Sequence, residues 1–169
     1  MVMLVTGVAG FIGTNFLYYY LNKYPDSEIL GIDKLTYAGN FNNLLSLDKK
    51  SFAFIQGDIS NKSFVNLLFK RYDITSIINF AAESHVDRSI KDASIFIKSN
   101  VYGTFNLIHC AKQNLLKNNR WKPNFKYLQI STDEVYGSVL NNERFSEITP
   151  RRTRFFISLV FVYTQVIYA

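Results

Sequence analysis

Short apolar runs alternate with longer amphipathic stretches along residues 1–132. Five runs have the length and apolar or β-branched content of buried strands, at 2–6, 28–33, 52–58, 76–82 and 126–132. Four stretches have helical spacing, at 14–24, 41–47, 62–72 and 93–116, of which the second is short. Strands that alternate with helices in this way predict βαβ units and a parallel sheet.

The pattern therefore predicts an α/β fold, a Rossmann-like doubly wound parallel sheet of about five strands. No repeat, low-complexity segment or linker interrupts residues 1–150, so we expect these residues to form one domain. The composition changes at residue 151. The segment 151–169 opens with Arg151, Arg152 and Arg154 and continues with fifteen uncharged residues.

Composition and charge narrow the function classes. Apolar residues make up 48% and charged residues 19% of the 169 residues, as in soluble globular proteins. The net charge is +6, but residues 1–150 hold sixteen basic and thirteen acidic side chains, which leaves them only +3. Since the lysines are scattered, we expect no nucleic-acid partner. The single cysteine and the absence of a signal-peptide pattern favour a cytoplasmic protein.

A glycine-rich loop, TGVAGFIG, follows the first predicted strand and opens the first helix. Gly7, Gly10 and Gly13 suit a tight turn, a close approach of the backbone to a pyrophosphate, and close packing of helix on strand. Asp33 ends the second strand, where a carboxylate can bind the hydroxyls of an adenosine ribose and repel a 2′-phosphate. This spacing predicts a dinucleotide site that prefers NAD.

The loop AAESHVDRSI follows the fourth predicted strand, at the edge of the sheet where ligands bind. Glu83, His85 and Asp87 could be interpreted as metal ligands. Two carboxylates and one imidazole without cysteines form a weak metal pattern, so we expect no metal site.

The segment ISTDEVYG follows the fifth predicted strand and carries the candidate catalytic side chains. The hydroxyl of Thr132 could orient a sugar, and the neighbouring carboxylates of Asp133 and Glu134 could act as an acid and a base. The alternative is a plain turn in which Asp133 caps a helix. The chemistry of the residues leaves both interpretations open.

Five segments, in this order and spacing, resemble the dTDP-glucose 4,6-dehydratases of the extended short-chain dehydrogenase/reductase family: VTGVAGFIG, DKLTYAGN, GDI, AAESHVDRSI and ISTDEVYG. The resemblance covers residues 1 to about 150 and about half of such an enzyme, so the later strands and the C-terminal domain would be missing. It implies a homodimeric lyase that uses NAD to convert dTDP-glucose to dTDP-4-keto-6-deoxyglucose, in rhamnose-type nucleotide-sugar biosynthesis.

The resemblance also implies roles for individual residues. Glu134 matches the base that removes the C5 proton, Asp133 the acid that protonates the departing C6 hydroxyl, and Thr132 and Ser84 substrate contacts. The matching cofactor contacts are Gly7, Gly10, Phe11, Ile12, Gly13, Asp33, Lys34, Leu35, Thr36, Asp58, Ile59, Phe80, Ala81, Ala82, Glu83, Ser84 and Ser99.

The sequence lacks one motif of the family pattern at the position where the family carries it. The family carries a catalytic Tyr-x-x-x-Lys on the next helix, whereas the only such motif in these 169 residues is Tyr19–Lys23 on the first helix. We therefore expect this polypeptide to bind NAD weakly and not to turn over. The alternatives are a non-catalytic NAD-binding fragment and a related nucleotide-sugar dehydratase or 4-epimerase.

The segment 151–169 allows three interpretations. A frameshift or truncation after residue 150 is favoured, because the resemblance and the composition change together. A membrane segment is less favoured, since a spanning helix needs about 20 apolar residues. The third interpretation is an extra strand that covers the edge of the sheet.

Overall fold

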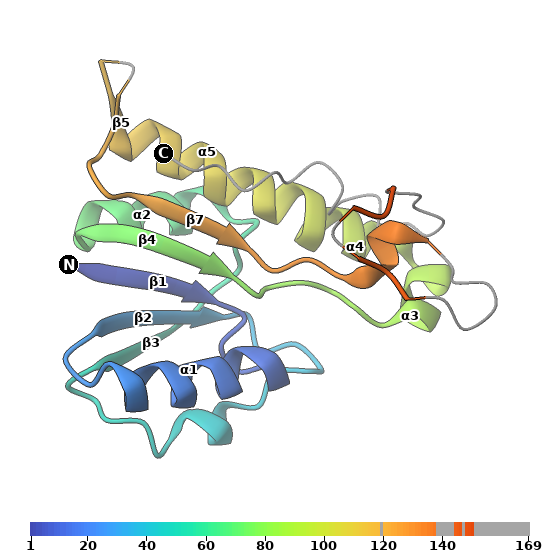
Figure 1. Cartoon of the computed structure of the whole chain (residues 1–169), viewed down its shortest axis with the longest axis horizontal. Coiled ribbons are helices and arrows are strands. Elements are labelled where there is room, and N and C mark those ends of the chain that lie inside the picture. Colours follow the sequence, from blue (N-terminus) through green and yellow to red (C-terminus); the bar gives the residue numbers. More distant parts are fainter. Residues whose placement is uncertain (119, 138–143, 147, 151–169) are drawn as a thin grey trace.

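The computed structural model describes residues 1–118, 120–137, 144–146 and 148–150. Five parallel strands form its main sheet: β1 (Val2–Thr6), β2 (Glu28–Asp33), β3 (Phe52–Gln56), β4 (Ile74–Asn79) and β7 (Lys126–Gln129). They lie in the order β3-β2-β1-β4-β7 (Figure 1). This arrangement confirms the predicted doubly wound parallel sheet.

Helices cover both faces of this sheet (Figure 1). On one side lie α1 (Phe11–Lys23) and the short 3-10 helix η1 (Phe41–Leu44). On the other side α2 (Lys62–Arg71) packs against α5 (Thr104–Leu115). Because successive side chains of a strand point to opposite faces, Leu4 joins the core under α2 and α5, while Val5 joins the core under α1.

The predicted strands begin within two residues of the observed ones, but several predicted segments continue beyond the point where the pairing ends. The third run was expected to extend to residue 58, the fourth to 82 and the fifth to 132, whereas β3, β4 and β7 end at Gln56, Asn79 and Gln129. The residues that follow each strand form the loops at the carboxyl edge of the sheet, on the right of Figure 1. Of these extra residues, 57–58 and 80–82 line the pocket described below.

The predicted helix at 93–116 is not regular. It consists of α4 (Ala93–Phe96), the π-helical segment η2 (Ile97–Gly103) and α5. A π-helix widens the turn and shifts the direction of the side chains that follow. Apolar periodicity does not distinguish it from an α-helix, so the sequence pattern missed it.

Four further short elements were not predicted. They are α3 (Val86–Lys91), the 3-10 helix η3 (Asp133–Tyr136), and the hairpin strands β5 (Leu116–Lys117) and β6 (Arg120–Trp121). Each is too short to give a periodic signal.

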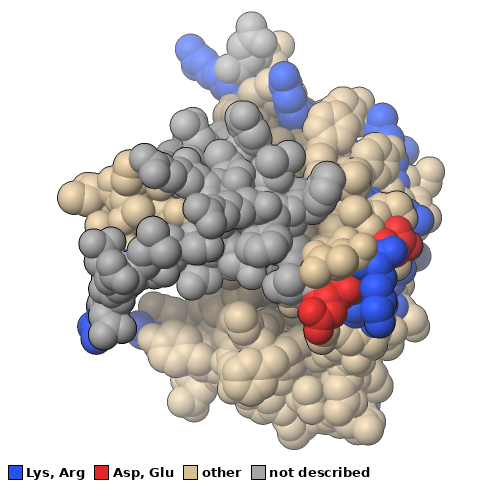
Figure 2. All heavy atoms as spheres, turned by 90° about the vertical axis from the view of Figure 1, so that its right-hand side faces the viewer, with Lys and Arg blue, Asp and Glu red and all other residues tan. Residues whose placement is uncertain are grey.

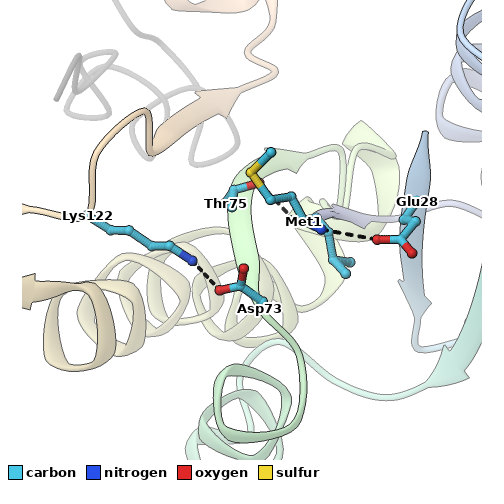
Figure 3. Close-up of polar contacts among 6 residues, drawn as sticks. Met1, Glu28, Asp73, Thr75 and Lys122 are labelled. Atoms are coloured by element: carbon cyan, nitrogen blue, oxygen red, sulfur yellow. Dashed lines mark hydrogen bonds and ion pairs between the residues drawn. The ribbon is translucent and has the colours of Figure 1, made fainter. Parts of the chain in front are cut away.

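Polar contacts join the amino ends of four strands in two pairs, β1 with β2 and β4 with β7 (Figure 3). The N-terminal ammonium of Met1 lies 3.1 Å from Oε2 of Glu28 at the start of β2. Lys122, ahead of β7, forms an ion pair with Asp73, which precedes β4. Since these pairs are exposed to solvent, they contribute little to stability.

No helix in the described part of the chain is long and apolar enough to cross a membrane. The segment 151–169, and with it all three interpretations of its role, lies outside the described residues.

Candidate functional site

The order of the strands places a crevice at the carboxyl ends of β1 and β4. The chain moves outward from β1 to β2 and β3 and then returns to place β4 on the other side of β1. Ligands of open α/β sheets bind at such a reversal point. A pocket lies there, lined by Gly7, Gly10, Ile32, Asp33, Lys34, Thr36, Ala38, Gly39, Gly57, Asp58, Ile59, Phe80, Ala81, Ala82, Glu83 and Ser99.

The glycine loop between β1 and α1 forms the floor of this pocket. Gly7 has a φ of +70°, and a Cβ there would lie 2.7 Å from the backbone of Phe80 and Ala81. At Gly13 a Cβ would lie 2.2 Å from the carbonyl oxygen of Gly7. These two positions therefore require glycine for the turn itself and for the packing of α1 on β1.

Gly10 differs from the other two glycines of the loop. A Cβ at Gly10 would meet only the Gly7 carbonyl oxygen, at 3.4 Å, and would otherwise point into open space. Gly10 also precedes α1, whose first turn has neither a side-chain cap nor an acidic residue. Uncapped N–H groups at a helix start bind anions well, so this end of the pocket suits a phosphate.

Asp33 is held in place by the loops on either side of it. Its Oδ2 accepts a hydrogen bond from the Ala9 N–H at 2.9 Å, and its Oδ1 accepts one from the Leu35 N–H at 2.7 Å. The second contact accompanies a φ of +57° at Leu35, a strained conformation typical of functional sites. A carboxylate has about four acceptor positions, so Asp33 keeps about two for a ligand hydroxyl.

Lys34 and Asp58 form an ion pair across the pocket wall, with Nζ 2.9 Å from Oδ2. Burial alone would raise the pKa of the Asp58 carboxyl, but hydrogen bonds from Lys34 and from Ser60 outweigh burial and hold the pKa below its usual value. The ammonium next to Asp33 is therefore already paired.

Glu83 is the buried carboxyl of the pocket. Only 5% of the residue is exposed, and its Oε2 finds no hydrogen-bond partner within the described part of the chain. Burial raises the pKa of Glu83, an effect that Arg88 and Lys34 oppose only partly. The backbone of Glu83 is fixed by Asn100, whose amide donates to its carbonyl and accepts from its N–H, both at 2.8 Å.

The structure brings most of the predicted cofactor residues together. Twelve of the seventeen line the pocket: Gly7, Gly10, Asp33, Lys34, Thr36, Asp58, Ile59, Phe80, Ala81, Ala82, Glu83 and Ser99. Five do not: Phe11, Ile12, Gly13, Leu35 and Ser84. Phe11 and Ile12 begin α1 with exposed side chains, so only their backbone groups are suited to a ligand at the helix start.

Four lining residues were not predicted: Ile32, Ala38, Gly39 and Gly57. Ile32 precedes Asp33, and Gly57 precedes Asp58. Because both lie at the end of a predicted strand, their position could have indicated that they line the pocket. Ala38 and Gly39 belong to the loop after β2, where short apolar residues give no chemical signal.

The candidate catalytic residues follow β7. Thr132 is partly buried next to η3, and its carbonyl accepts a hydrogen bond from the Val135 N–H at 3.4 Å. Asp133 and Glu134 are the first two residues of η3, and their side chains lie outside the described part of the structure. Ser84 and Ser99, from the loop after β4 and from η2, lie on the same carboxyl edge.

The remaining polar candidates do not join this site. Among the described residues no group of three or more His, Cys, Asp and Glu side chains is placed to hold a metal ion. His109 stacks on Phe105 within α5, at 5.4 Å between ring centroids. The pair Tyr19–Lys23 lies exposed on α1, with Nζ 3.4 Å from the phenol oxygen, and neither residue lines the pocket.

The described residues on the face that carries the pocket show few charged atoms (Figure 2). Figure 2 views the carboxyl edge of the sheet, where most of the described surface is uncharged and the acidic atoms lie beside Lys and Arg atoms. The visible basic side chains are dispersed and form no continuous patch (Figure 2).

Comparison with known proteins gives consistent relatives. A probable dTDP-glucose 4,6-dehydratase of Sinorhizobium fredii is 42% identical over 151 residues, which are 88% of this chain and 42% of that protein. A dTDP-glucose 4,6-dehydratase of Bacillus anthracis, solved in complex with NAD, is 38% identical with a TM-score of 0.78, over 95% of this chain and 46% of that one. The chain thus spans less than half the length of these relatives.

A UDP-glucose 4-epimerase of Thermus thermophilus, solved with NAD, has the same TM-score of 0.78 but only 26% identity, over 95% of this chain and 47% of that one. The family model described as GDP-mannose 4,6-dehydratase matches residues 4–155. The chain belongs to this family of sugar-nucleotide dehydratases.

Proposed function

We propose that residues 1–150 form the NAD-binding part of a dTDP-glucose 4,6-dehydratase. The observation that carries the proposal is the pocket at the reversal point of the sheet, which gathers the glycine loop, Asp33 and the loop after β4. Relatives with the same overall fold and about 40% identity carry this activity in their names.

The residues present fit a dinucleotide. Gly10 leaves room where a side chain would otherwise fill the space beside the uncapped start of α1, which suits the pyrophosphate. Asp33 keeps free acceptor positions for the two hydroxyls of an adenosine ribose. The neighbouring cation Lys34 is paired with Asp58, so nothing beside Asp33 compensates a 2′-phosphate, which favours NAD over NADP.

Bound NAD would supply the acceptor for a hydride from C4 of the sugar and would return this hydride to C6 after water has left. The family pattern assigns the proton of the 4-hydroxyl to the tyrosine of the Tyr-x-x-x-Lys motif. Residues of this chain match the positions that carry out other steps of the dehydration. The hydroxyl of Thr132 would orient the sugar, the Glu134 carboxylate would take the C5 proton, and the Asp133 carboxyl would protonate the departing C6 hydroxyl. Ser84 would contact the substrate from the loop after β4. These roles rest on the match of ISTDEVYG and AAESHVDRSI to the dehydratase pattern.

A 4-epimerase is the second candidate function. It would use the same fold and cofactor, as the equal TM-scores of the dehydratase and the epimerase illustrate. The dehydratase is favoured because identity is 38% against 26%, and because the adjacent acids Asp133 and Glu134 suit the removal of water across two carbons.

A second copy of the chain is the protein partner that we propose. Apolar side chains remain exposed along η2 and α5, namely Ile97, Val101, Tyr102 and Phe105, each between 44% and 58% exposed. Exposed apolar residues in one stretch of a helix are typical of an interface. The pairing would bury this stretch against its equivalent.

Titration of the purified chain with NAD and with NADP tests the proposed function. We expect calorimetry to detect NAD binding and weaker NADP binding. Gly10→Ala should weaken NAD binding about tenfold or more while the free energy of unfolding changes by less than about 1 kcal/mol, because the added Cβ enters the pocket.

Gly7→Ala is the matched contrast. It should lower the free energy of unfolding by about 2 kcal/mol or more. An alanine would have to adopt the positive φ of Gly7, and its Cβ would overlap the backbone of Phe80 and Ala81. If the folded wild-type chain shows no heat of NAD binding at millimolar concentration, the proposed function is wrong for this polypeptide.

A further inference from the structure

One contact joins the two side walls of the pocket. The guanidinium carbon of Arg88, in α3, lies 4.0 Å from the centroid of the Tyr37 ring, in the loop after β2. The ring of His85 meets the same tyrosine edge-on, at 6.4 Å between centroids and 75° between planes. A cation at this distance over an aromatic face is a favourable interaction.

The position of this contact follows from the sheet. Both β2 and β4 pair with β1, so the loops that follow them start about 10 Å apart, at roughly 4.8 Å per strand spacing. The carboxyl end of β1 and its glycine loop lie between them. Side chains that join the two loops must therefore cross the edge of the sheet where the pocket opens.

The residues next to the contact line the pocket on both sides. Thr36 and Ala38 flank Tyr37 and belong to one wall, whereas Ala81 to Glu83 form the other wall and lead into the turn that carries His85. Glu83 and Arg88 are near enough to influence the pKa of Tyr37: burial and the Glu83 carboxyl raise it, and Arg88 lowers it. Tyr37 therefore sits among groups of the opposite wall.

We propose that Tyr37 and Arg88 act as a clasp that positions the two walls around the bound dinucleotide and slows its release. The proposal rests on the proposed NAD site and adds positioning residues to it. Neither Tyr37 nor Arg88 lines the pocket, and they act through the loops on which they lie. No chemical step is assigned to them.

The release rate of NADH from the full chain tests the clasp. Bound NADH is displaced by excess NAD in a stopped-flow fluorimeter, and the association rate is measured separately. Tyr37→Ala and Arg88→Ala should each raise the dissociation rate constant about threefold to tenfold, with less than a twofold loss in the association rate constant. The double variant should release NADH no faster than about twofold beyond either single variant, because both changes remove the same contact.

Conservative and remote variants separate the contact from general damage. Tyr37→Phe keeps the ring under Arg88 but removes the hydroxyl that interacts with Ser84 and with the backbone of His85, so it should raise the release rate less than Tyr37→Ala does. Tyr24→Ala is the matched control, since Tyr24 is a similarly exposed tyrosine with Lys23 over its ring at 5.4 Å, outside the pocket. Hydrogen exchange without ligand supplies a second readout, in which both alanine variants should speed exchange in residues 34–40.

Three outcomes would overturn the clasp while leaving the proposed function intact: single variants with release rates within twofold of wild type, fully multiplicative effects in the double variant, or an equal effect of Tyr24→Ala. Failure of the wild-type chain to bind NADH at all would instead refute the proposed function and the clasp together.

Discussion

At the residue scale, the least expected feature of the site is the buried carboxyl of Glu83. It is costly to bury a carboxylate oxygen that finds no hydrogen-bond partner within the described part of the chain, and burial raises the pKa of Glu83. Arg88 and Lys34 face this carboxyl from α3 and from the loop after β2 without forming an ion pair with it. The pKa of Glu83 therefore differs between the folded and the unfolded chain.

This raised pKa makes stability depend on pH. Between the usual pKa of a glutamate and the higher folded value, the folded chain binds more protons than the unfolded chain, so stability falls as pH rises through that interval. Glu83→Gln removes the titrating group. We expect it to flatten this pH dependence and to raise the free energy of unfolding above the interval by about 1 kcal/mol.

Urea denaturation of wild type and Glu83→Gln at several pH values between 4 and 8 provides the measurement. Asp26→Asn, an exposed change in the loop before β2, serves as the control and should leave the slope unchanged. A Glu83→Gln variant whose stability still falls with pH as steeply as wild type would show that another group causes the dependence.

At the scale of elements, the π-helical segment η2 connects α5 to the pocket. It carries Ser99, which lines the pocket, and the fully buried Asn100, which holds the backbone of Glu83 from both sides. Single π-turns within α-helices occur often at functional sites, where they redirect side chains. Here the widened turn aims two consecutive residues at the loop after β4.

We expect Asn100→Ala to lower the free energy of unfolding by about 2–4 kcal/mol, because it leaves a buried carbonyl and a buried N–H of Glu83 unpaired. NAD binding should weaken as well, since the loop loses its anchor. Chemical denaturation and NAD titration of the folded fraction are the measurements.

Asn15→Ala is the matched control, because the Asn15 amide donates one exposed hydrogen bond to the Phe11 carbonyl. It should change stability by less than about 0.5 kcal/mol. Equal effects of the two substitutions would mean that the anchoring of Glu83 is unimportant.

At the scale of the whole molecule, the chain spans the cofactor half of its relatives. It covers 42% of the Sinorhizobium fredii protein and 46% of the Bacillus anthracis chain. The pocket is complete on the sides built by β1, β2 and β4, but the only Tyr-x-x-x-Lys of these 169 residues lies on α1, outside it. The residues that line the pocket therefore include the candidates for binding a dinucleotide, but no Tyr-x-x-x-Lys pair.

We expect residues 1–169 to bind NAD but to form no 4-keto-6-deoxy sugar from dTDP-glucose. The loss of a tyrosine base costs about 10²–10⁴ in rate. Product formation can be followed by the absorbance of the 4-keto sugar in alkali, with the full-length Bacillus anthracis relative as the positive control. A steady rate proportional to the concentration of this chain would contradict the expectation.

The interpretation of residues 151–169 as the product of a frameshift or truncation can be tested in the coding DNA. The coding DNA should be read through and beyond codon 150 in all three frames. A second frame that encodes a Tyr-x-x-x-Lys helix and a further domain would support a frameshift. If no frame does so, the membrane-segment and strand interpretations of 151–169 require direct tests.

The sequence by itself determined the layer structure and the chemistry of the floor of the pocket. Apolar runs of five or six residues, such as 2–6 and 28–33, locate strands to the residue because a buried parallel strand must be apolar on both faces. The spacing of Gly7, Gly10 and Gly13 predicted three different steric roles. The contacts of Gly7 and Gly13 show the tight turn and the close packing, whereas the role of Gly10 beside a pyrophosphate stays a prediction.

Only the tertiary structure decided which side chains act together. The pairing of Lys34 with Asp58 and the contact of Tyr37 with Arg88 join residues from different loops. The burial of Glu83, whose Oε2 finds no partner within the described part of the chain, likewise depends on the packing around it. Sequence order does not reveal such distances, because they depend on the order of the strands and on the π-helical turn. The sequence names the residue types. Their burial, their pairing and the contacts between the loops on either side of β1 are set by tertiary packing.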